Sequence, residues 1–205
     1  MSRPAKTPKR NTRQEILDAA EKLFAQKGYP GTTLDDVAVA VNIRRPSLLY
    51  HFPNKNALFQ GVIDRLVEGQ QAMEQNLDSA DYDCALDKMN ALIDGWLDWL
   101  VAHRNFASIL LHNMASDSAE DFEFWNKQTL LRDPYVNTLR DGIKSGEFRN
   151  AHSEELHALT AGYPAYFLRL ACAGKQGQID QQTIARLKDD VRRLTRALLL
   201  QDPYN

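Results

Sequence analysis

The chain has 205 residues, of which 43% are apolar and 25% charged, with ten Gly, eight Pro and two Cys. This length fits one or two domains with a sizeable core, and the composition excludes collagen-like, low-complexity and disulfide-stapled secreted proteins. No apolar run approaches the ~20 residues of a membrane span, and the N-terminus lacks the apolar core of a secretory signal. The two distant cysteines suit a reducing compartment. A cytoplasmic protein that does not enter a membrane is expected.

The formal net charge of -2 conceals an uneven distribution. Residues 1–60 carry ten Lys and Arg against five Asp and Glu, a balance of +5, whereas residues 61–205 carry fifteen against twenty-two, a balance of -7. A basic head on an acidic body indicates that the head meets a polyanion and that the body stays away from it. Charge alone leaves nucleic acid and an anionic membrane surface both open.

The head begins with a basic arm followed by an amphipathic helix. Residues 1–11 hold four basic residues and two Pro with almost nothing apolar, which predicts a disordered arm. The arm is either a solubilising tail or a segment that contacts the polyanion. From Thr12 onward apolar residues recur at helical spacing, and Gly28 marks the end of this helix. Its apolar face comprises Ile16, Leu17, Ala20, Leu23 and Phe24.

Two short helices joined by a tight turn come next. Thr33 and Asp36 have the spacing of a capping box. Asn42 tolerates the left-handed conformation that a tight turn between helices needs, and Pro46 fits the first turn of the following helix, where no N–H is required. Two short helices connected in this way form a helix-turn-helix. Asn54 is expected to cap the helix after it.

The rest of the chain predicts further helices, so the fold is expected to be all-α with about nine helices. The last two expected helices, 154–173 and 183–200, carry apolar residues at alternating spacings of three and four. Such seams are typical of near-parallel packing in four-helix bundles. Two helices make half a bundle, so a second copy of the chain is the simple completion, and the alternative is that both seams pack on their own body. The other expected helices cover about 58–73, 84–103, 106–114, 120–131 and 134–144.

Residues 12–58, about a quarter of the chain, contain an ordered set of residues: Thr12, Arg13, Ile16, Leu17, Ala19, Ala20, Leu23, Phe24, Gly28, Tyr29, Thr32, Thr33, Val37, Ala38, Ile43, Pro46, Ser47, Leu48, His51, Phe52, Lys55 and Leu58. In this set the head resembles the DNA-binding region of TetR-family transcriptional regulators. In the remainder, Gly142 to Arg149 is similar to a segment common in the family. The resemblance implies an N-terminal three-helix helix-turn-helix domain and a C-terminal helical domain for ligand binding and dimerisation.

The family resemblance also implies a function. A homodimer would bind an inverted-repeat operator through its two heads, most often as a repressor, and a small molecule in the body would release the DNA. Two-fold symmetric heads favour palindromic DNA on physical grounds as well. The chain then divides into an arm (1–11), a helix-turn-helix domain (12–58) and a ligand-binding and dimerisation domain (59–205).

Position in the helix-turn-helix assigns the residues expected to bind DNA. Arg44 and Arg45 lie where the recognition helix starts and are best placed to read guanine. Pro46 and Ser47 match family positions that touch bases or backbone. Thr33 offers a hydroxyl at a helix N-terminus to a phosphate. The remaining expected contacts are a thymine methyl for Leu49, phosphates for Tyr50 and Lys55, and for His51 either DNA or packing at the rim of the domain.

The head departs from the family pattern at several positions. Asn42 stands where the family has Gly, and Leu49 stands where it has an aromatic residue, with Tyr50 displaced by one position. Asp35 faces a place where relatives often carry a base, and we expect it to lower non-specific affinity for DNA.

The body holds all three Trp and suits a small apolar or aromatic effector. Aromatic residues at helical spacing are more often plain core, so each assignment competes with a packing role. No catalytic motif, metal-ligand cluster or cofactor loop stands out, and neither an enzyme nor a metal or cofactor is expected. A DNA-binding protein without an effector, or a helical enzyme with a DNA-binding head, are the alternatives. The residues expected to touch an effector are Trp96, Trp99, Phe106, His112, Trp125 and Tyr166.

Overall fold

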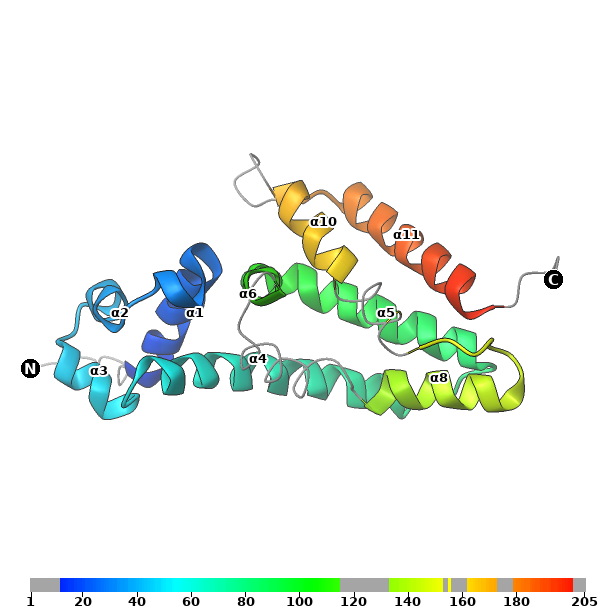
Figure 1. Ribbon diagram of the computed structural model, residues 1–205, viewed down its shortest axis with the longest axis horizontal. Coiled ribbons are helices and arrows are strands. Elements are labelled where there is room, and N and C mark those ends of the chain that lie inside the picture. The colour runs from blue at the N-terminus through cyan, green and yellow to red at the C-terminus, as the bar shows by residue number, and fades with distance from the viewer. Residues whose placement is uncertain (1–11, 115–132, 153–154, 156–161, 173–178, 201–205) are drawn as a thin grey trace, which may run out of the picture. The chain divides into compact units, whose positions relative to one another are not determined.

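A computed structural model describes residues 12–114, 133–152, 155, 162–172 and 179–200 (Figure 1). Every regular element within these residues is a helix, which confirms the predicted all-α fold. The chain divides into two compact units, Met1–Ile63 and Asp64–Asn205. The arm 1–11, the expected helix 120–131 with Trp125, and much of the segment 154–161 lie outside the described residues.

The first unit contains three helices and the start of a fourth: α1 (Thr12–Gly31), α2 (Leu34–Val41), α3 (Arg45–His51) and the beginning of α4 (Lys55–Asp78). Gly28 interrupts α1 with φ 71° and ψ 174°, which is the break that the sequence predicts there. A side chain at this φ would be strained. The helices enclose a core that includes Ile16, Leu17, Phe24, Val37, Leu48 and Leu58, all almost fully buried.

Two asparagines shape this unit as predicted. Asn42 ends α2 in the left-handed conformation, with φ 55° and ψ 48°. Its N–H donates to the carbonyl of Val39, and the N–H of Ile43 donates to that of Ala38. Asn can hold this conformation without a glycine, so the departure from the family pattern preserves the turn. Asn54 caps α4 by accepting the N–H of Ala57 at 2.8 Å.

The second unit is built around α5 (Ala85–Ala102), which contacts α8 (Asp133–Ser145), α11 (Gln181–Leu199), α6 (Arg104–Met114) and α10 (Tyr163–Cys172). Figure 1 shows α5 in green with α8 and α11 running beside it. One face of α5 is buried along its length, including Met89, Leu92, Ile93, Trp96, Leu97 and Leu100. The periodicity predicts the bounds of α5, α6 and α8 to within two residues.

The loop after α8 joins parts of this unit that are far apart in sequence. Gly146 adopts φ 80°, and the ring of Phe148 lies so close to Gly142 that a Cβ there would sit 2.1 Å from its Cδ2 atom. Glu147 accepts the backbone N–H groups of Ala85 and Leu86 at 2.9 Å each, which caps α5. These contacts give the Gly142–Arg149 segment a structural role in the body.

Ion pairs join α5 to α11 in antiparallel register. Lys188 Nζ lies 2.6 Å from Asp98 Oδ1, and Arg192 forms a two-pronged contact with Asp94 in which Nε lies 2.9 Å from Oδ1. The carboxylate of Asp94 raises the pKa of Arg192, which stays charged. None of the helices in the described part of the chain is long and apolar enough to cross a membrane.

Candidate nucleic-acid interface

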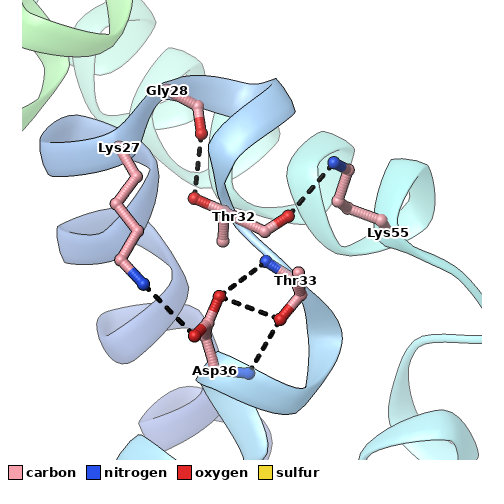
Figure 2. Close-up of polar contacts among 6 residues, drawn as sticks. All are labelled: Lys27, Gly28, Thr32, Thr33, Asp36 and Lys55. Atoms are coloured by element: carbon pink, nitrogen blue, oxygen red, sulfur yellow. Dashed lines mark hydrogen bonds and ion pairs between the residues drawn. The ribbon is translucent and has the colours of Figure 1, made fainter.

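A capping box holds the start of α2 (Figure 2). The N–H of Asp36 donates to Thr33 Oγ1 at 3.1 Å, the N–H of Thr33 donates to Asp36 Oδ2 at 3.0 Å, and the Thr33 hydroxyl donates to the same oxygen at 2.8 Å. Lys27 Nζ lies 3.2 Å from Asp36 Oδ1. Hydrogen bonds from Thr33, helped by Lys27, lower the pKa of Asp36. The Thr33 hydroxyl hydrogen that was expected to reach a phosphate is thus engaged with Asp36.

The helix α3 presents a polar and basic surface to solvent. Leu48 is fully buried and anchors the helix to the core of the first unit. Tyr50 is 86% exposed and Leu49 36% exposed, and His51 is half-buried with its ring edge-on to Tyr50 at 5.3 Å. The residues expected to meet DNA that are exposed on or beside α3 are Arg44, Arg45, Pro46, Ser47, Leu49 and Tyr50.

Lys55 lies at the start of α4 and holds the turn after α1. Its ammonium donates to the carbonyls of Tyr29 at 2.8 Å and Thr32 at 3.1 Å, and it lies 4.3 Å from the centre of the Tyr29 ring. Thr32 is buried, and its hydroxyl donates to the carbonyl of Gly28 at 2.9 Å (Figure 2). An ammonium has three N–H groups, and these two bonds use two of them. The contact of Lys55 with a phosphate stays a prediction.

Sequence reasoning missed two features of this surface. Arg45 Nη1 lies 2.7 Å from Asp35 Oδ2, so the two short helices are joined by an ion pair across their exposed side. Val39 on α2 is 79% exposed. The pattern contains a signal for Val39, because the buried face of α2 consists of Val37, Ala38 and Val41 and leaves Val39 to point outward. Only the folded turn brings Asp35 and Arg45 together.

In the second unit, the structure brings together three of the residues expected to touch an effector. The rings of Trp96 and Trp99 stack at 5.4 Å with an interplanar angle of 10°, and Phe106 lies edge-on to both. All three are buried. Tyr166 does not join them and is 58% exposed on α10. Trp125 lies outside the described residues.

Several buried polar atoms in this unit have no hydrogen-bond partner among the residues that the structure describes. They include Trp99 Nε1, His112 Nε2 and Gln70 Oε1. A buried polar group without a partner costs about 1–3 kcal/mol, and such atoms in a native protein require an explanation. Gln70 itself is only 4% exposed and donates to Glu74 at 2.7 Å.

The seam on α11 divides into two parts. Leu187 and Val191 are fully buried within their own unit. These two residues of the seam therefore pack on their own body and not on a second copy of the chain. Leu194 remains 36% exposed. On α10, the ring centroids of Tyr163 and Phe167 lie 6.3 Å apart. Tyr166 points to solvent. Apolar surface therefore remains on both helices.

The first unit has the geometry of one class of protein module. A buried anchor, a left-handed turn and a second helix with exposed arginines define a helix-turn-helix DNA-binding domain. The family model described as "Bacterial regulatory proteins, tetR family" matches residues 16–62. Over these residues the head is similar to the DNA-binding region of TetR-family regulators.

A curated relative supports the same assignment for the head. The chain is 50% identical over 48 residues to the biofilm operon icaADBC HTH-type negative transcriptional regulator IcaR of Staphylococcus aureus (strain Newman). The match covers 23% of this chain and 26% of that protein, so the chain spans about a quarter of the length of the curated relatives it matches.

Solved structures resemble nearly the whole chain at low identity. A putative fatty acid metabolism regulator of Clostridium perfringens has a TM-score of 0.71 at 20% identity and covers 90% of this chain and 96% of its own. The regulator FadR of Bacillus subtilis, solved with stearoyl-CoA, has a TM-score of 0.67 at 19% identity, with 88% and 96% covered. These likenesses show the fold. All the proteins named here are regulators rather than enzymes.

Proposed function

We propose that this protein is a dimeric transcriptional repressor that binds palindromic operator DNA and is released from it by a small molecule. The observation that carries the proposal is the helix-turn-helix, in which Arg44, at the N-cap of α3, and Arg45, Ser47 and Tyr50, on α3, are exposed. Arginine at the start of a recognition helix is suited to the edge of guanine. Repression agrees with the role of IcaR as a negative transcriptional regulator. Such a protein works in the cytoplasm, where the chromosome lies.

The DNA-binding role is tested by selecting bound duplexes from a random pool with the full-length protein. Enrichment of one palindrome is expected, because two identical heads related by a two-fold axis read two identical half-sites. Arg45→Ala should then cost about 1–3 kcal/mol on the selected site. A pool that yields no enriched palindrome would overturn the proposal.

The dimer is proposed to form through 154–173 and 183–200. Exposed apolar side chains on α10 and α11, including Tyr166 and Leu194, support this surface. Leu194→Glu is expected to give a folded monomer by light scattering, because a carboxylate would have to be buried in the interface. Arg196→Glu, at an exposed position of the same helix, serves as the charge control. A Leu194→Glu protein that stays dimeric places the interface elsewhere.

An effector site is proposed next to the aromatic cluster of Trp96, Trp99 and Phe106. The stacked indoles suit an apolar or aromatic ligand. Trp99 Nε1 and His112 Nε2, which have no partner within the described part of the chain, suit polar atoms on it. Trp125 is proposed to contribute as the sequence predicts, whereas Tyr166 is exposed on α10 and is left to the proposed dimer surface. Fatty acyl-CoA thioesters are the first compounds to test, because the FadR structure contains one.

The effector test measures release of the selected DNA and the change in tryptophan fluorescence on titration. Both should move together for an effector, since all Trp residues lie in the body. A protein whose DNA binding responds to no compound in a broad screen is a regulator without an effector.

A further inference from the structure

Asp35 and Arg45 form an ion pair on the surface proposed to face DNA. Asp35 lies in the first turn of α2, and Arg45 is the first residue of α3. Arg45 Nη1 donates to Asp35 Oδ2 at 2.7 Å, with the two side chains 55% and 60% exposed. The neighbouring Asp36 is held by Thr33 and Lys27, so the capping of α2 does not require Asp35.

Fold stability gives a weak reason for this pair. An exposed ion pair contributes little to stability because water screens it, and a carboxylate in the first turn of a helix adds only a modest stabilisation. Against this, a carboxylate on a DNA-binding surface repels phosphates and weakens binding to any sequence. The position of Asp35 therefore carries a cost for DNA affinity that its small effect on folding does not explain.

The guanidinium chemistry of Arg45 indicates what the pair achieves. A guanidinium is planar and carries five N–H groups in a fixed arrangement. Asp35 takes an N–H of Nη1 and leaves the edge formed by Nε and Nη2 without involvement in this pair. Two parallel N–H groups on one edge match the N7 and O6 acceptors of guanine. A carboxylate on the opposite side fixes the plane of that edge.

We propose that Asp35 is a positioning residue that orients Arg45 for guanine and so determines the sequence specificity of the head. This inference rests on the proposed DNA-binding function. On the correct site, Arg45 keeps its contact with Asp35 and spends less conformational entropy when it binds the base. On other sequences no guanine compensates for the carboxylate, so the same residue weakens binding to random DNA.

The test compares variants of the full-length protein on matched duplexes. The first duplex is the palindrome selected by the native protein. The second carries a substitution, in both half-sites, at the guanine whose preference disappears when the selection is repeated with Arg45→Ala. The third is a scrambled sequence. Binding constants are measured at several salt concentrations for the native protein, Asp35→Asn, Arg45→Ala and the double variant.

Asp35→Asn is expected to lower the preference for the guanine site over the substituted site by about tenfold, since a bidentate arginine–guanine contact carries most of that discrimination. It should bind scrambled DNA severalfold more tightly and steepen the salt dependence by up to about one unit per head. In the Arg45→Ala background, the same change should leave the guanine preference unaltered, because Asp35 acts through Arg45.

Asp18→Asn is the matched control, an exposed carboxylate on α1 that accepts a hydrogen bond from Gln14. It should leave the guanine preference at the native value. A loss of folding would weaken binding to all three duplexes together, and thermal unfolding of each variant measures it. A selective loss of the preference for the guanine site over the substituted site indicates an effect on the orientation of Arg45.

Several results would overturn the inference. An Asp35→Asn protein that binds all three duplexes more tightly by one common factor makes Asp35 a simple charge. A rise in guanine preference makes Asp35 a competitor for Arg45 rather than its support. If the selection with Arg45→Ala loses the preference for no particular base, Arg45 does not contact a base. Asp35 then has no base contact to orient. Failure of the proposed function looks different, because then the native protein itself enriches no palindrome.

Discussion

Polar contacts stabilise the head and the body each from within, and these contacts differ greatly in how far apart in the sequence the joined residues lie. In the head, the capping box joins residues three apart, and the longest tie described above joins Lys55 to Tyr29, 26 residues apart. In the body, Tyr135 donates to the carbonyl of Leu92 across 43 residues, Glu147 caps α5 across 62, and Arg192 reaches Asp94 across 98. Short-range contacts are visible in a sequence, and long-range contacts appear only in the folded chain.

This contrast has a practical consequence for measurement. All three Trp residues lie in the body, at positions 96, 99 and 125. Tryptophan fluorescence therefore reports unfolding of the body alone, and hydrogen exchange of α2 amides reports the head. The following variants separate the two units, from the largest expected effect to the smallest.

Gly142→Ala should damage the body most. Its Cβ would lie 2.1 Å from Phe148 Cδ2, so the ring must leave its site. Overpacking of this kind costs typically about 1–3 kcal/mol, and we expect the upper end, as a lower urea midpoint by tryptophan fluorescence. Gly69→Ala is the control, because its nearest contact would be an ordinary 3.7 Å to Trp99 Nε1. Equal midpoints for both variants would contradict the tight contact.

Lys55→Met should have the largest effect on the head. The methionine keeps the apolar stem but loses the hydrogen bonds to the carbonyls of Tyr29 and Thr32. Hydrogen bonds from a charged donor are worth about 1.5–3 kcal/mol each, so a loss of about 2 kcal/mol is expected for this half-buried group. Faster exchange of α2 amides would report it. Lys22→Met, at an exposed position of α1, should leave exchange unchanged.

Glu147→Gln should weaken the body by about 1 kcal/mol, the usual value of a helix cap with its charge. Glutamine offers one acceptor oxygen to the two N–H groups of Ala85 and Leu86 that the carboxylate now accepts. The urea midpoint by tryptophan fluorescence checks this. Asp141→Asn removes an exposed carboxylate from α8 and should have no comparable effect; a similar loss there would point to net charge instead.

Asp36→Asn should produce the smallest change, and a pH-dependent one. Because the hydrogen bonds of Thr33 lower the pKa of Asp36 in the folded head, its contribution is complete above the ordinary value of 3.8. That contribution is lost as pH falls through the lowered pKa. Exchange of α2 amides should therefore accelerate less on acidification in the variant than in the native protein. Identical pH profiles would remove Asp36 as the cause.

The predictability of each region follows the range of its contacts. The break at Gly28, the capping box at Thr33 and the left-handed Asn42 all follow from neighbouring residues, and the structure confirms each. The helices α5, α6 and α8 follow from apolar periodicity. The ion pair between Asp35 and Arg45 and the hydrogen bonds of Lys55 cannot be predicted from neighbouring residues. They form only when the turns between the helices of the head bring these residues together.

The body shows the same limit at its candidate effector site. Trp96 and Trp99 on α5 and Phe106 on α6 come together in one cluster, and their contact with an effector stays a prediction. Tyr166 lies on the surface of α10 although its spacing is that of a core residue. Periodicity indicates that a face is apolar, but it does not indicate whether this chain or another covers it.

The loop that follows α8 satisfies two helix macrodipoles at once. Glu147 places a negative charge at the positive start of α5, and Arg149 places a positive charge at the negative end of α11, where its side chain donates to the carbonyl of Leu198. One short loop can supply both because antiparallel helices bring opposite poles to the same end. Exchanging the two residues would keep the composition and net charge of the chain while placing each charge at the wrong pole.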